Sequence, residues 1–304
     1  VRSSRNAAYG RPVSRYSEAF ARNIGLLTPA QQHRLQTSRV AIAGCGGAGG
    51  GYAAALARAG VGRFTLADPD AFEIVNFNRQ VGASLDTIGR NKAEVTGEIV
   101  RGIVPDVDVR VLPVAVDQTT IDAFLDEVDV VCDALDFFAP DARRLVFREA
   151  RARGIPVITG GPLMWSAAWT VWLPDGPSLE QFCGFQPGMS RDEVLTRFVV
   201  AAAPGGTHLR YTDTTTIDFD THEAPSLGPV CTMLHGIVAS EVVNLLTGVR
   251  PVRAIPHYAQ FDMRTLRFKA GRARWGNDGP IQRVKIAYVT RRLGQGAQER
   301  AKTG

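Results

Sequence analysis

Three charged side chains in the first half of the chain are of the types needed for chemistry on a nucleoside triphosphate. Arg79 and Lys92 are cations, and Asp136 follows a short apolar run at residues 129–133. Cations neutralise the charge that develops on a leaving pyrophosphate, and a carboxylate can hold a magnesium ion that bridges phosphates. These residue types predict phosphate chemistry, with Asp136 as the magnesium ligand.

Simpler interpretations of these side chains stay open at the level of the sequence. Lys92 is one of four lysines against 31 arginines, but an exposed lysine is the ordinary case. Asp136 precedes a predicted helix that starts at Pro140, and a carboxylate in that place often caps the helix.

A glycine-rich segment lies upstream, where a strand should pass into a helix. An apolar run at 40–43 precedes it and an alanine-rich segment at 52–58 follows it, and its four glycines are Gly44, Gly46, Gly47 and Gly49. Such glycines allow a tight turn and a close approach of phosphates to backbone amides at a helix start. Asp68, about twenty residues further on, is placed to bond ribose hydroxyls.

This glycine pattern alone does not choose between nucleotides. It fits an NAD-dependent oxidoreductase equally well, and glycines can also serve only to pack a helix on a strand. A dehydrogenase, however, needs no pair of cations beside its nucleotide. Arg79 and Lys92 therefore favour a triphosphate over NAD.

The elements that must position these residues alternate between strand and helix. Apolar runs at 63–68, 108–114, 129–133 and 155–159 predict strands, and the spacing of apolar residues at 88–103, 120–125 and 140–151 predicts helices. Repeated β-α units of this length indicate an α/β fold with a doubly wound, mostly parallel, Rossmann-like sheet.

The pattern changes after residue 160. We expect a strand at 167–173, helices at 191–203 and 227–246, a hairpin at 258–269 and a basic helix at 284–293, with a polar loop at 204–225. These features predict four parts: a basic and helical arm at 1–38, an ATP-binding domain at 39–160, a smaller substrate-facing half at 161–270 whose crossover loop is 204–225, and a basic tail at 271–304.

Taken together, the motifs of this chain resemble the ubiquitin-activating-enzyme-like adenylyltransferases, the group that includes ThiF, MoeB and HesA. The resemblance covers residues 20–262, and the segments that carry it are 44–49, 56–70, 76–80, 88–92 and 133–136. It implies an enzyme in which a substrate carboxylate attacks the α-phosphate of ATP, giving an acyl-adenylate and pyrophosphate. ATP and Mg²⁺ are the expected cofactors.

The resemblance also implies roles for individual residues. Asp68 would bind ribose, Asp136 would hold magnesium, and the phosphate contacts would come from Asn76, Arg79 and Lys92. Asp70 and Gln80, in the same motifs, are further candidates for nucleotide binding. Family members place an arginine before the first strand that reaches the ATP site of a dimer partner, and Arg22 matches it, so a homodimer is expected.

Two features of the family pattern are missing from this sequence. The paired C-x-x-C motifs that hold zinc in many relatives are absent, because the four cysteines Cys45, Cys132, Cys183 and Cys231 lie far apart, so no structural zinc is expected. Relatives that form a covalent intermediate carry a cysteine where this chain has Thr221. Cys183 is the best remaining thiol candidate, Cys231 has the pattern of a packing residue, and transfer without a catalytic cysteine is expected.

Composition limits the class of protein. With 45% hydrophobic and 21% charged residues the chain can bury a large core, no apolar run looks long enough for a membrane span, and residues 1–15 lack the apolar block of a signal peptide. We therefore expect a cytoplasmic protein without a membrane partner.

Charge is unevenly distributed. Residues 1–39 carry seven arginines and one acidic residue, residues 264–304 carry eleven basic and two acidic residues, and residues 40–263 carry 17 basic and 27 acidic residues. The basic ends can bind an acidic partner, RNA or the acidic body of the protein itself.

The sequence thus predicts adenylation of a carboxylate on a peptide or on a small ubiquitin-like sulfur-carrier protein. A carboxylate on tRNA is a less favoured substrate, although the tails are basic. An NAD-dependent oxidoreductase and a non-catalytic nucleotide-binding adaptor are the alternatives.

Overall fold

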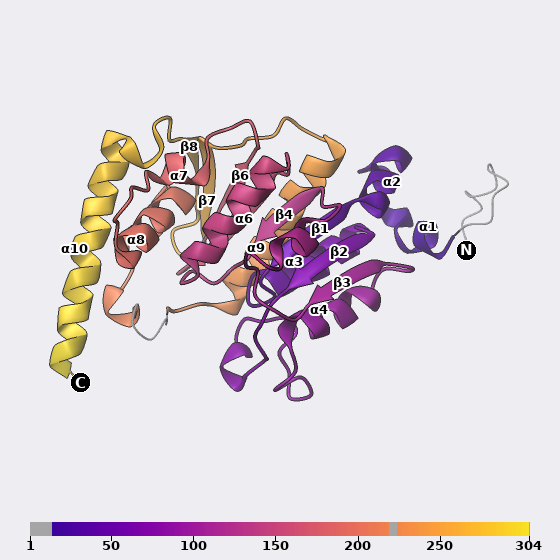
Figure 1. Ribbon diagram of the computed structural model, residues 1–304, viewed down its shortest axis with the longest axis horizontal. Helices are drawn as coiled ribbons and strands as arrows, with labels where there is room; N and C mark the ends of the chain where they lie inside the picture. The colour runs from indigo at the N-terminus through magenta and orange to yellow at the C-terminus, as the bar shows by residue number, and fades with distance from the viewer. Residues whose placement is uncertain (1–13, 219–223, 304) are drawn as a thin grey trace.

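The computed structural model describes residues 14–218 and 224–303, in which one eight-stranded sheet runs through the molecule (Figure 1). The strands lie in the order β3-β2-β1-β4-β5-β6-β7-β8. Their bounds are β1 Arg39–Ala43, β2 Arg63–Ala67, β3 Asp108–Leu112, β4 Val130–Asp133, β5 Val157–Leu163, β6 Ser166–Trp172, β7 His257–Asp262 and β8 Arg267–Arg272.

The first five strands are parallel and the last three are antiparallel to their neighbours. In the register of the parallel half, Ala43 lies opposite Ala67 on one side and Asp133 on the other. The carboxyl ends of β1, β2 and β4 are therefore level with one another. Ligands bind outside such strand ends in open α/β sheets, so this edge is where the candidate residues should meet.

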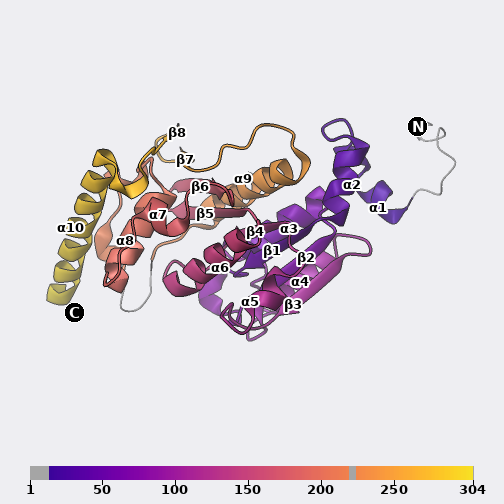
Figure 2. The same ribbon diagram turned by 45° about the horizontal axis from the view of Figure 1, so that its top comes forward.

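Helices cover both faces of the sheet (Figure 2). One face carries α2 (Pro29–Thr37), α3 (Gly49–Ala59), α4 (Lys92–Arg101) and α9 (Gly228–Thr247), and the other carries α5 (Ile121–Leu125), α6 (Pro140–Ala152), α7 (Leu179–Cys183) and α8 (Arg191–Ala202).

Alternation along β1 divides the core into two clusters. Val40 and Ile42 pack with α3 and α9, whereas Ala41 and Ala43 pack with α5 and α6. Strand side chains alternate between the two faces of a sheet, so a strand buried on both faces is apolar along most of its length, as β1 is after Arg39.

The predicted α/β class with a doubly wound, mostly parallel nucleotide half is confirmed, and several boundaries differ. The helix α3 begins at Gly49, not residue 52, and α4 begins at Lys92, not residue 88. The short α7 was not predicted, and neither was the length of the terminal helix α10 (Pro280–Thr303). Strand β5 continues through residue 160 to Leu163, across the expected domain boundary, and the four-part division stays a prediction.

The expectation that no apolar run is long enough for a membrane span was wrong for one helix. In the part of the chain that the structure describes, α9 is long and apolar enough to cross a membrane by length and composition alone, with a mean hydropathy of 1.5. It packs against α2, α3, β5 and β6, and residues such as Leu234 and Val238 are completely buried. This is the packing of a helix in a protein core. Burial in such a core also explains why the helix is apolar on all sides.

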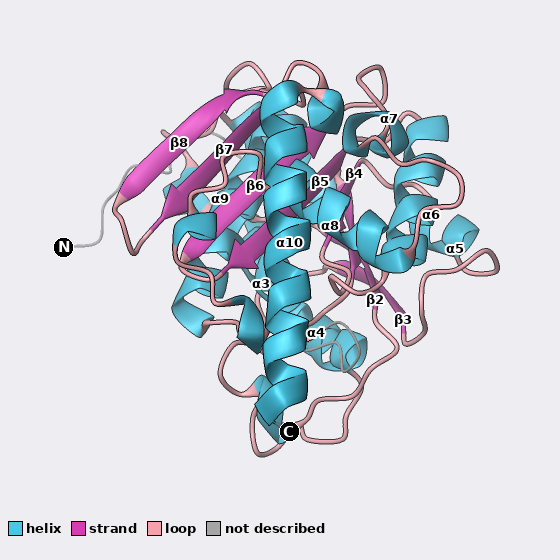
Figure 3. Ribbon diagram, turned by 90° about the vertical axis from the view of Figure 1, so that its left-hand side faces the viewer, coloured by secondary structure: helices cyan, strands magenta, loops and turns pink. Residues whose placement is uncertain are grey.

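The terminal helix α10 crosses the antiparallel end of the molecule (Figure 3). It packs against α8 and against the single turn at Thr214–Thr216 within the polar segment. The first turns of α10 contain Lys285, whose Nζ donates to the carbonyl oxygen of Pro204. Over the residues described, the basic C-terminal segment is thus packed onto the second half of the chain. The short helix α1 (Arg15–Ala19) lies near the start of the described chain, at the opposite end of the molecule from α10 (Figure 1).

Candidate functional site

The glycine-rich loop joins the end of β1 to the start of α3. Gly44 has a φ of +91°, and a Cβ atom on it would lie 2.3 Å from the carbonyl oxygen of Ala134. A Cβ on Gly49 would lie 1.8 Å from the carbonyl oxygen of Gly44. Only glycine tolerates both conditions, so the loop is held tightly against the segment that follows β4.

The next two glycines lie against Arg79 and Gln80. A Cβ on Gly47 would meet Cγ of Arg79 at 3.3 Å, and one on Gly46 would lie 3.6 Å from the Gln80 amide. The Gln80 side chain is 7% exposed, and its Oε1 has no hydrogen-bond partner in the described chain. An unpaired buried acceptor is costly, which indicates a place for a ligand donor beside the loop.

Asp68 links the second strand to the loop. It is 5% exposed, and its carboxylate accepts from the backbone N–H of Cys45 at 2.6 Å and of Asp70 at 2.9 Å. Burial raises the pKa of Asp68 against the opposing effect of these hydrogen bonds and of Lys92. The carboxylate therefore lies between the end of β2 and the glycine loop, where the sequence predicts that it binds ribose.

Lys92 is the first residue of α4 and is 8% exposed. Its Nζ lies 3.0 Å from Oδ2 of Asp70, and its backbone N–H donates to the Asp70 carbonyl. Asn91 caps the helix and donates to the carbonyl of Asp68. The elements thus fix the side chain of Lys92 beside Asp68 and Asp70, and its position at a helix start adds to the attraction for an anion.

The two acidic residues after β4 differ in environment. Asp133 is buried and accepts from Arg143 at 2.9 Å and from Thr159 at 2.7 Å. Asp136 is exposed, and one of its oxygens accepts from the N–H of Phe138 at 2.7 Å. Asp136 therefore shapes the turn before α6, whose cap position is Ala139, and keeps its second oxygen available to solvent.

Asn76 and Arg79 occupy the segment opposite the loop. The buried Asn76 side chain accepts from the N–H of Glu73 at 3.0 Å and so closes a single helical turn. The Arg79 guanidinium donates to the carbonyl oxygen of Val75 and to the side chain of Asn78. Asn78 in turn reaches Ser226, just before α9, which places this segment between the loop and α9.

Arg22 does not join the other candidates within one chain. It is exposed in the turn Ala21–Asn23, and the adjacent Asn23 bonds to the carbonyl oxygen of Ala59 at the far end of α3. The glycine loop lies at the opposite end of that helix. Any contribution of Arg22 to a nucleotide site therefore has to come from a second copy of the chain.

A histidine that no sequence pattern singled out supports the loop. The Nε2 atom of His235, in α9, lies 2.7 Å from the carbonyl oxygen of Gly47. Its ring fills the space beside Gly51, where a Cβ would come within 2.2 Å of it. The extra glycine in the run at 49–51 was a signal of close packing in the sequence, but it did not identify His235 as the residue that packs there.

The thiols of the described residues are all buried. Cys183, in α7, has no exposed surface, and burial raises its pKa far above the ordinary value. Cys231 contacts Ser226 at 3.5 Å, and burial raises its pKa as well. The expectation that Cys231 packs agrees with this burial, whereas Cys183 lies where no substrate reaches it. Thr221 lies outside the described residues.

The hydrogen-bonding and charged groups at this edge of the sheet fit a nucleotide. Backbone amides at the start of α3, the unpaired Gln80 acceptor and the cations Arg79 and Lys92 surround a loop whose glycines leave no side chains in the way. Residues 14–218 and 224–303 contain no cluster of three or more His, Cys, Asp or Glu that could hold a metal. A magnesium ion would thus depend on Asp136 and on the phosphates themselves.

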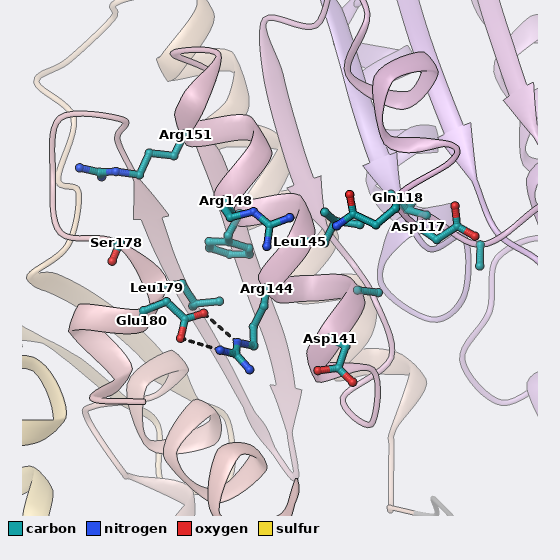
Figure 4. A pocket seen from close by; sticks show the side chains of 14 residues that line it. Asp117, Gln118, Asp141, Arg144, Leu145, Arg148, Arg151, Ser178, Leu179 and Glu180 are labelled. Atoms are coloured by element: carbon teal, nitrogen blue, oxygen red, sulfur yellow. Dashed lines mark hydrogen bonds and ion pairs between the residues drawn. The ribbon is translucent and has the colours of Figure 1, made fainter. Parts of the chain in front are cut away.

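Two cavities differ in their relation to this edge of the sheet. The larger, of about 800 Å³, lies between α6, α7 and the segment 115–118, and Figure 4 shows Arg144 paired with Glu180 within it. It includes none of the predicted site residues. The smaller, of about 240 Å³, extends from Ala48 and Asp133 toward α8 and α10, so it is continuous with the candidate site.

Comparison with known proteins places the chain in a family. A family model described as the ThiF family matches residues 20–278. The SAMP-activating enzyme E1 of Haloferax volcanii is 36% identical over 181 residues, which are 58% of this chain and 65% of that protein.

Two bacterial relatives align over shorter segments. The tRNA threonylcarbamoyladenosine dehydratase of Bacillus subtilis is 36% identical, and the molybdopterin-synthase adenylyltransferase of Escherichia coli is 31% identical. Each alignment covers 46% of this chain, and they cover 55% and 56% of the two relatives, respectively. The chain thus spans a little over half to two thirds of the length of these curated relatives.

The fold has counterparts among solved structures. Escherichia coli MccB, crystallised with MccA-N7isoASN, superposes with a TM-score of 0.66 at 18% identity, covering 88% of this chain and 74% of that one. At this identity the likeness establishes the fold alone.

Proposed function

This chain belongs to the ThiF family, and on that premise we propose that it catalyses the ATP- and Mg²⁺-dependent adenylation of a carboxylate. The observation that carries the proposal is the buried Lys92 residue at the strand edge, whose Nζ pairs with Asp70 close to the glycine loop and Asp68. A buried lysine next to a phosphate-binding loop serves a triphosphate, whereas an NAD site has no use for it.

In the proposed reaction, a carboxylate oxygen of the substrate attacks the α-phosphorus of ATP. A new bond forms between that oxygen and phosphorus, the bond to the bridging oxygen breaks, and pyrophosphate leaves with the electron pair. A carboxylate is already ionised at pH 7 and needs no general base. The protein therefore contributes position and charge, which the site residues supply without a nucleophile.

Each candidate residue has a part in this proposal. Lys92 and Arg79 neutralise the phosphates, Asp68 binds ribose, and Gln80 accepts a ligand donor at the loop. Asn76 positions the segment that carries Arg79, and Asp70 orients Lys92 through their ion pair. Asp136 would hold a magnesium ion, which would offset the negative charge of the departing pyrophosphate.

The second copy of the chain supplies Arg22. Its distance from the loop within one chain, at the far end of α3, supports a homodimer in which each protomer completes the site of the other. The acyl-adenylate then passes to an acceptor without a covalent cysteine intermediate, in keeping with the burial of Cys183 and Cys231.

The substrate proposed is a peptide or a small carrier protein with a reactive terminal carboxylate, acted on in the cytoplasm. The relatives named SAMP-activating enzyme and molybdopterin-synthase adenylyltransferase support a protein substrate. The relative named tRNA threonylcarbamoyladenosine dehydratase, together with the basic segment 264–304, favours a carboxylate on tRNA as the second candidate.

Isotope exchange between labelled pyrophosphate and ATP tests the proposal. Exchange that requires a carboxylate pool, peptide or tRNA, supports it and identifies the class. Binding of ATP with no exchange in any pool would indicate a nucleotide-binding adaptor, and oxidation or reduction of a nicotinamide would indicate the dehydrogenase alternative; either result contradicts the proposal.

A further inference from the structure

The smaller cavity forms an apolar chamber at the carboxyl ends of β4 and β5. Its walls come from β5, α8, the polar segment and α10, and its apolar lining includes Leu163, Phe198, Leu209, Ile217, Val289 and Leu293. It has a volume of about 240 Å³, room for one large side chain but little more. We call this cavity the α10 chamber because α10 closes its outer wall.

The α10 chamber opens toward the proposed reaction site. Ala48 of the glycine loop and the segment Asp133–Leu135 line its inner end, and a Cβ on Gly161 would meet only Leu163, at ordinary contact distance. A group that enters from the proposed adenylation site therefore passes directly into apolar surroundings.

The charged groups that line the chamber are two arginines and Asp133. Arg143 pairs with Asp133 at 2.9 Å and stacks on the Phe198 ring at 4.2 Å. Arg292, on α10, donates to the carbonyl oxygen of Thr212. Nη1 of Arg143 is buried and has no hydrogen-bond partner among the described residues, so it remains able to donate to a ligand oxygen. An ammonium side chain would lose its hydration here without gaining an unpaired opposite charge, which disfavours it.

One neutral donor faces this lining. His208 is 6% exposed, and its Nδ1 accepts from Nε2 of Gln260 at 3.0 Å, because the Gln260 carbonyl oxygen is already used by the N–H of Thr207. The neutral ring then carries its hydrogen on Nε2, which bonds to no other described residue. Binding pockets commonly combine apolar walls with a few such polar groups.

We propose that the α10 chamber holds an apolar side chain, of leucine or phenylalanine size, on the carboxyl-terminal residue of a peptide substrate. The inference rests on the proposed function, since the reacting carboxylate would lie at the chamber mouth. His208 Nε2–H orients the substrate backbone by donating to a carbonyl oxygen. The chamber thus selects substrates that end in a large apolar residue over those that end in glycine.

Titration calorimetry with N-acetylated hexapeptides tests this selection. The peptides share five residues and end in glycine, lysine, leucine or phenylalanine with a free carboxylate, and a non-hydrolysable ATP analogue is present throughout. We expect the leucine and phenylalanine peptides to bind at least tenfold more tightly than the other two, as one buried side chain discriminates by about 10- to 200-fold.

Two wall substitutions and a control accompany the peptides. Ala202→Leu, at the end of α8, narrows the chamber and should remove the preference for leucine and phenylalanine without weakening the glycine peptide. Leu209→Ala widens it and should favour phenylalanine over leucine. Val284→Leu, 70% exposed on the same α10, should change nothing.

The outcomes separate the chamber from the reaction. Equal binding of all four peptides, tighter binding of the glycine or lysine peptide, or no binding of any peptide overturns the chamber proposal. Pyrophosphate exchange is measured with the same peptides. Selective binding without exchange leaves the chamber standing and contradicts adenylation of peptides, whereas exchange with the glycine peptide alone supports adenylation and contradicts the chamber.

Discussion

The imidazole of His235 reaches from α9 to the glycine loop, with its Nε2 atom 2.7 Å from the carbonyl oxygen of Gly47. The ring occupies the space that the missing side chain of Gly51 leaves open, and it lies edge-on to Tyr52 at 5.9 Å between ring centres. The loop that would receive the phosphates is thus fixed in part by a residue far along the chain.

The fit between His235 and Gly51 predicts opposite effects of two alanine substitutions. Gly51→Ala forces the ring away and should lower the free energy of unfolding by about 1–3 kcal/mol, as overpacking does. Gly236→Ala, next to His235 on α9, meets nothing within 4 Å and should raise it by about 0.5–1 kcal/mol. Urea unfolding measures both, and equal effects would show that the ring does not fill that space.

The hydrogen bond from His235 predicts a change in ATP binding. His235→Phe keeps an aromatic ring of similar shape and removes the donor, so the loop should hold phosphate less well. We expect the KM for ATP to rise about tenfold while kcat changes less than threefold, since about 1.4 kcal/mol corresponds to a factor of ten. A fall in kcat with an unchanged KM would assign His235 a different part.

Asp136 should be needed for chemistry and not for folding. Asp136→Asn keeps an oxygen that accepts from the N–H of Phe138 but removes the charge that would hold magnesium. Because the side chain is exposed, the melting temperature should change by only a few degrees, whereas pyrophosphate exchange should fall at least 100-fold. Exchange within threefold of the unchanged protein would refute the metal assignment.

Mixing two inactive variants tests the contribution of Arg22 across a dimer. The two variants are Arg22→Ala and Asp136→Ala. In a dimer of either variant alone, both sites lack one of the two residues. A mixed dimer contains one site in which both residues are intact. Random mixing of equal amounts should recover up to about one quarter of the activity, because half of the dimers are mixed and each has one intact site. Absence of recovery in a mixture shown to exchange protomers would count against the proposed dimer.

Stability should fall in acid because His208 is buried as a neutral ring. Burial lowers the pKa of His208 to about 4; nearby Asp262 opposes this decrease and Lys285 adds to it. Between pH 6.5 and about 4 the unfolded chain binds the proton and the folded chain does not, so stability declines as pH falls through this window. The loss should approach about 3 kcal/mol.

A matched pair of variants isolates this histidine. His208→Gln should remove most of the acid-dependent loss in urea unfolding measured from pH 7 to pH 4, whereas substitution of the exposed His33 by glutamine should leave it intact. His235, whose pKa burial also lowers, contributes a smaller slope that remains in His208→Gln. A pH profile unchanged by His208→Gln would contradict the buried neutral ring.

The parallel half of the sheet was predictable because its signals are local. Apolar runs give β1, β2 and β4, and the glycines between β1 and α3 fix the crossover at Gly44 and Gly49. Parallel strands then bring Asp68 and Asp136 to one edge without further information. The start of α4 at Lys92 follows from Asn91 as cap, a signal present in the sequence that the apolar spacing obscured.

Other features depend on contacts that no local pattern contains. Strand β5 continues through two glycines and a proline to Leu163 because it pairs with β6 along its full length, and sheet pairing overrode residues that favour a turn. The pairing of His235 with Gly51, and the closure of the chamber by α10, join residues far apart in the chain. The capping box of Ser178 and Gln181 did mark α7, but its five residues were too short for a periodic pattern.

The central claim is that the α-phosphate of ATP is transferred to a carboxylate as AMP. The direct measurement incubates the protein and Mg²⁺ with ATP labelled at the α- or at the γ-phosphate and with peptide and tRNA fractions from cell extract, then identifies the labelled molecule by mass spectrometry. We expect α-label on a carboxylate, γ-label only in released pyrophosphate, and neither with Asp136→Asn. Transfer of the γ-label to any acceptor, or no α-label on any carboxylate, would contradict it.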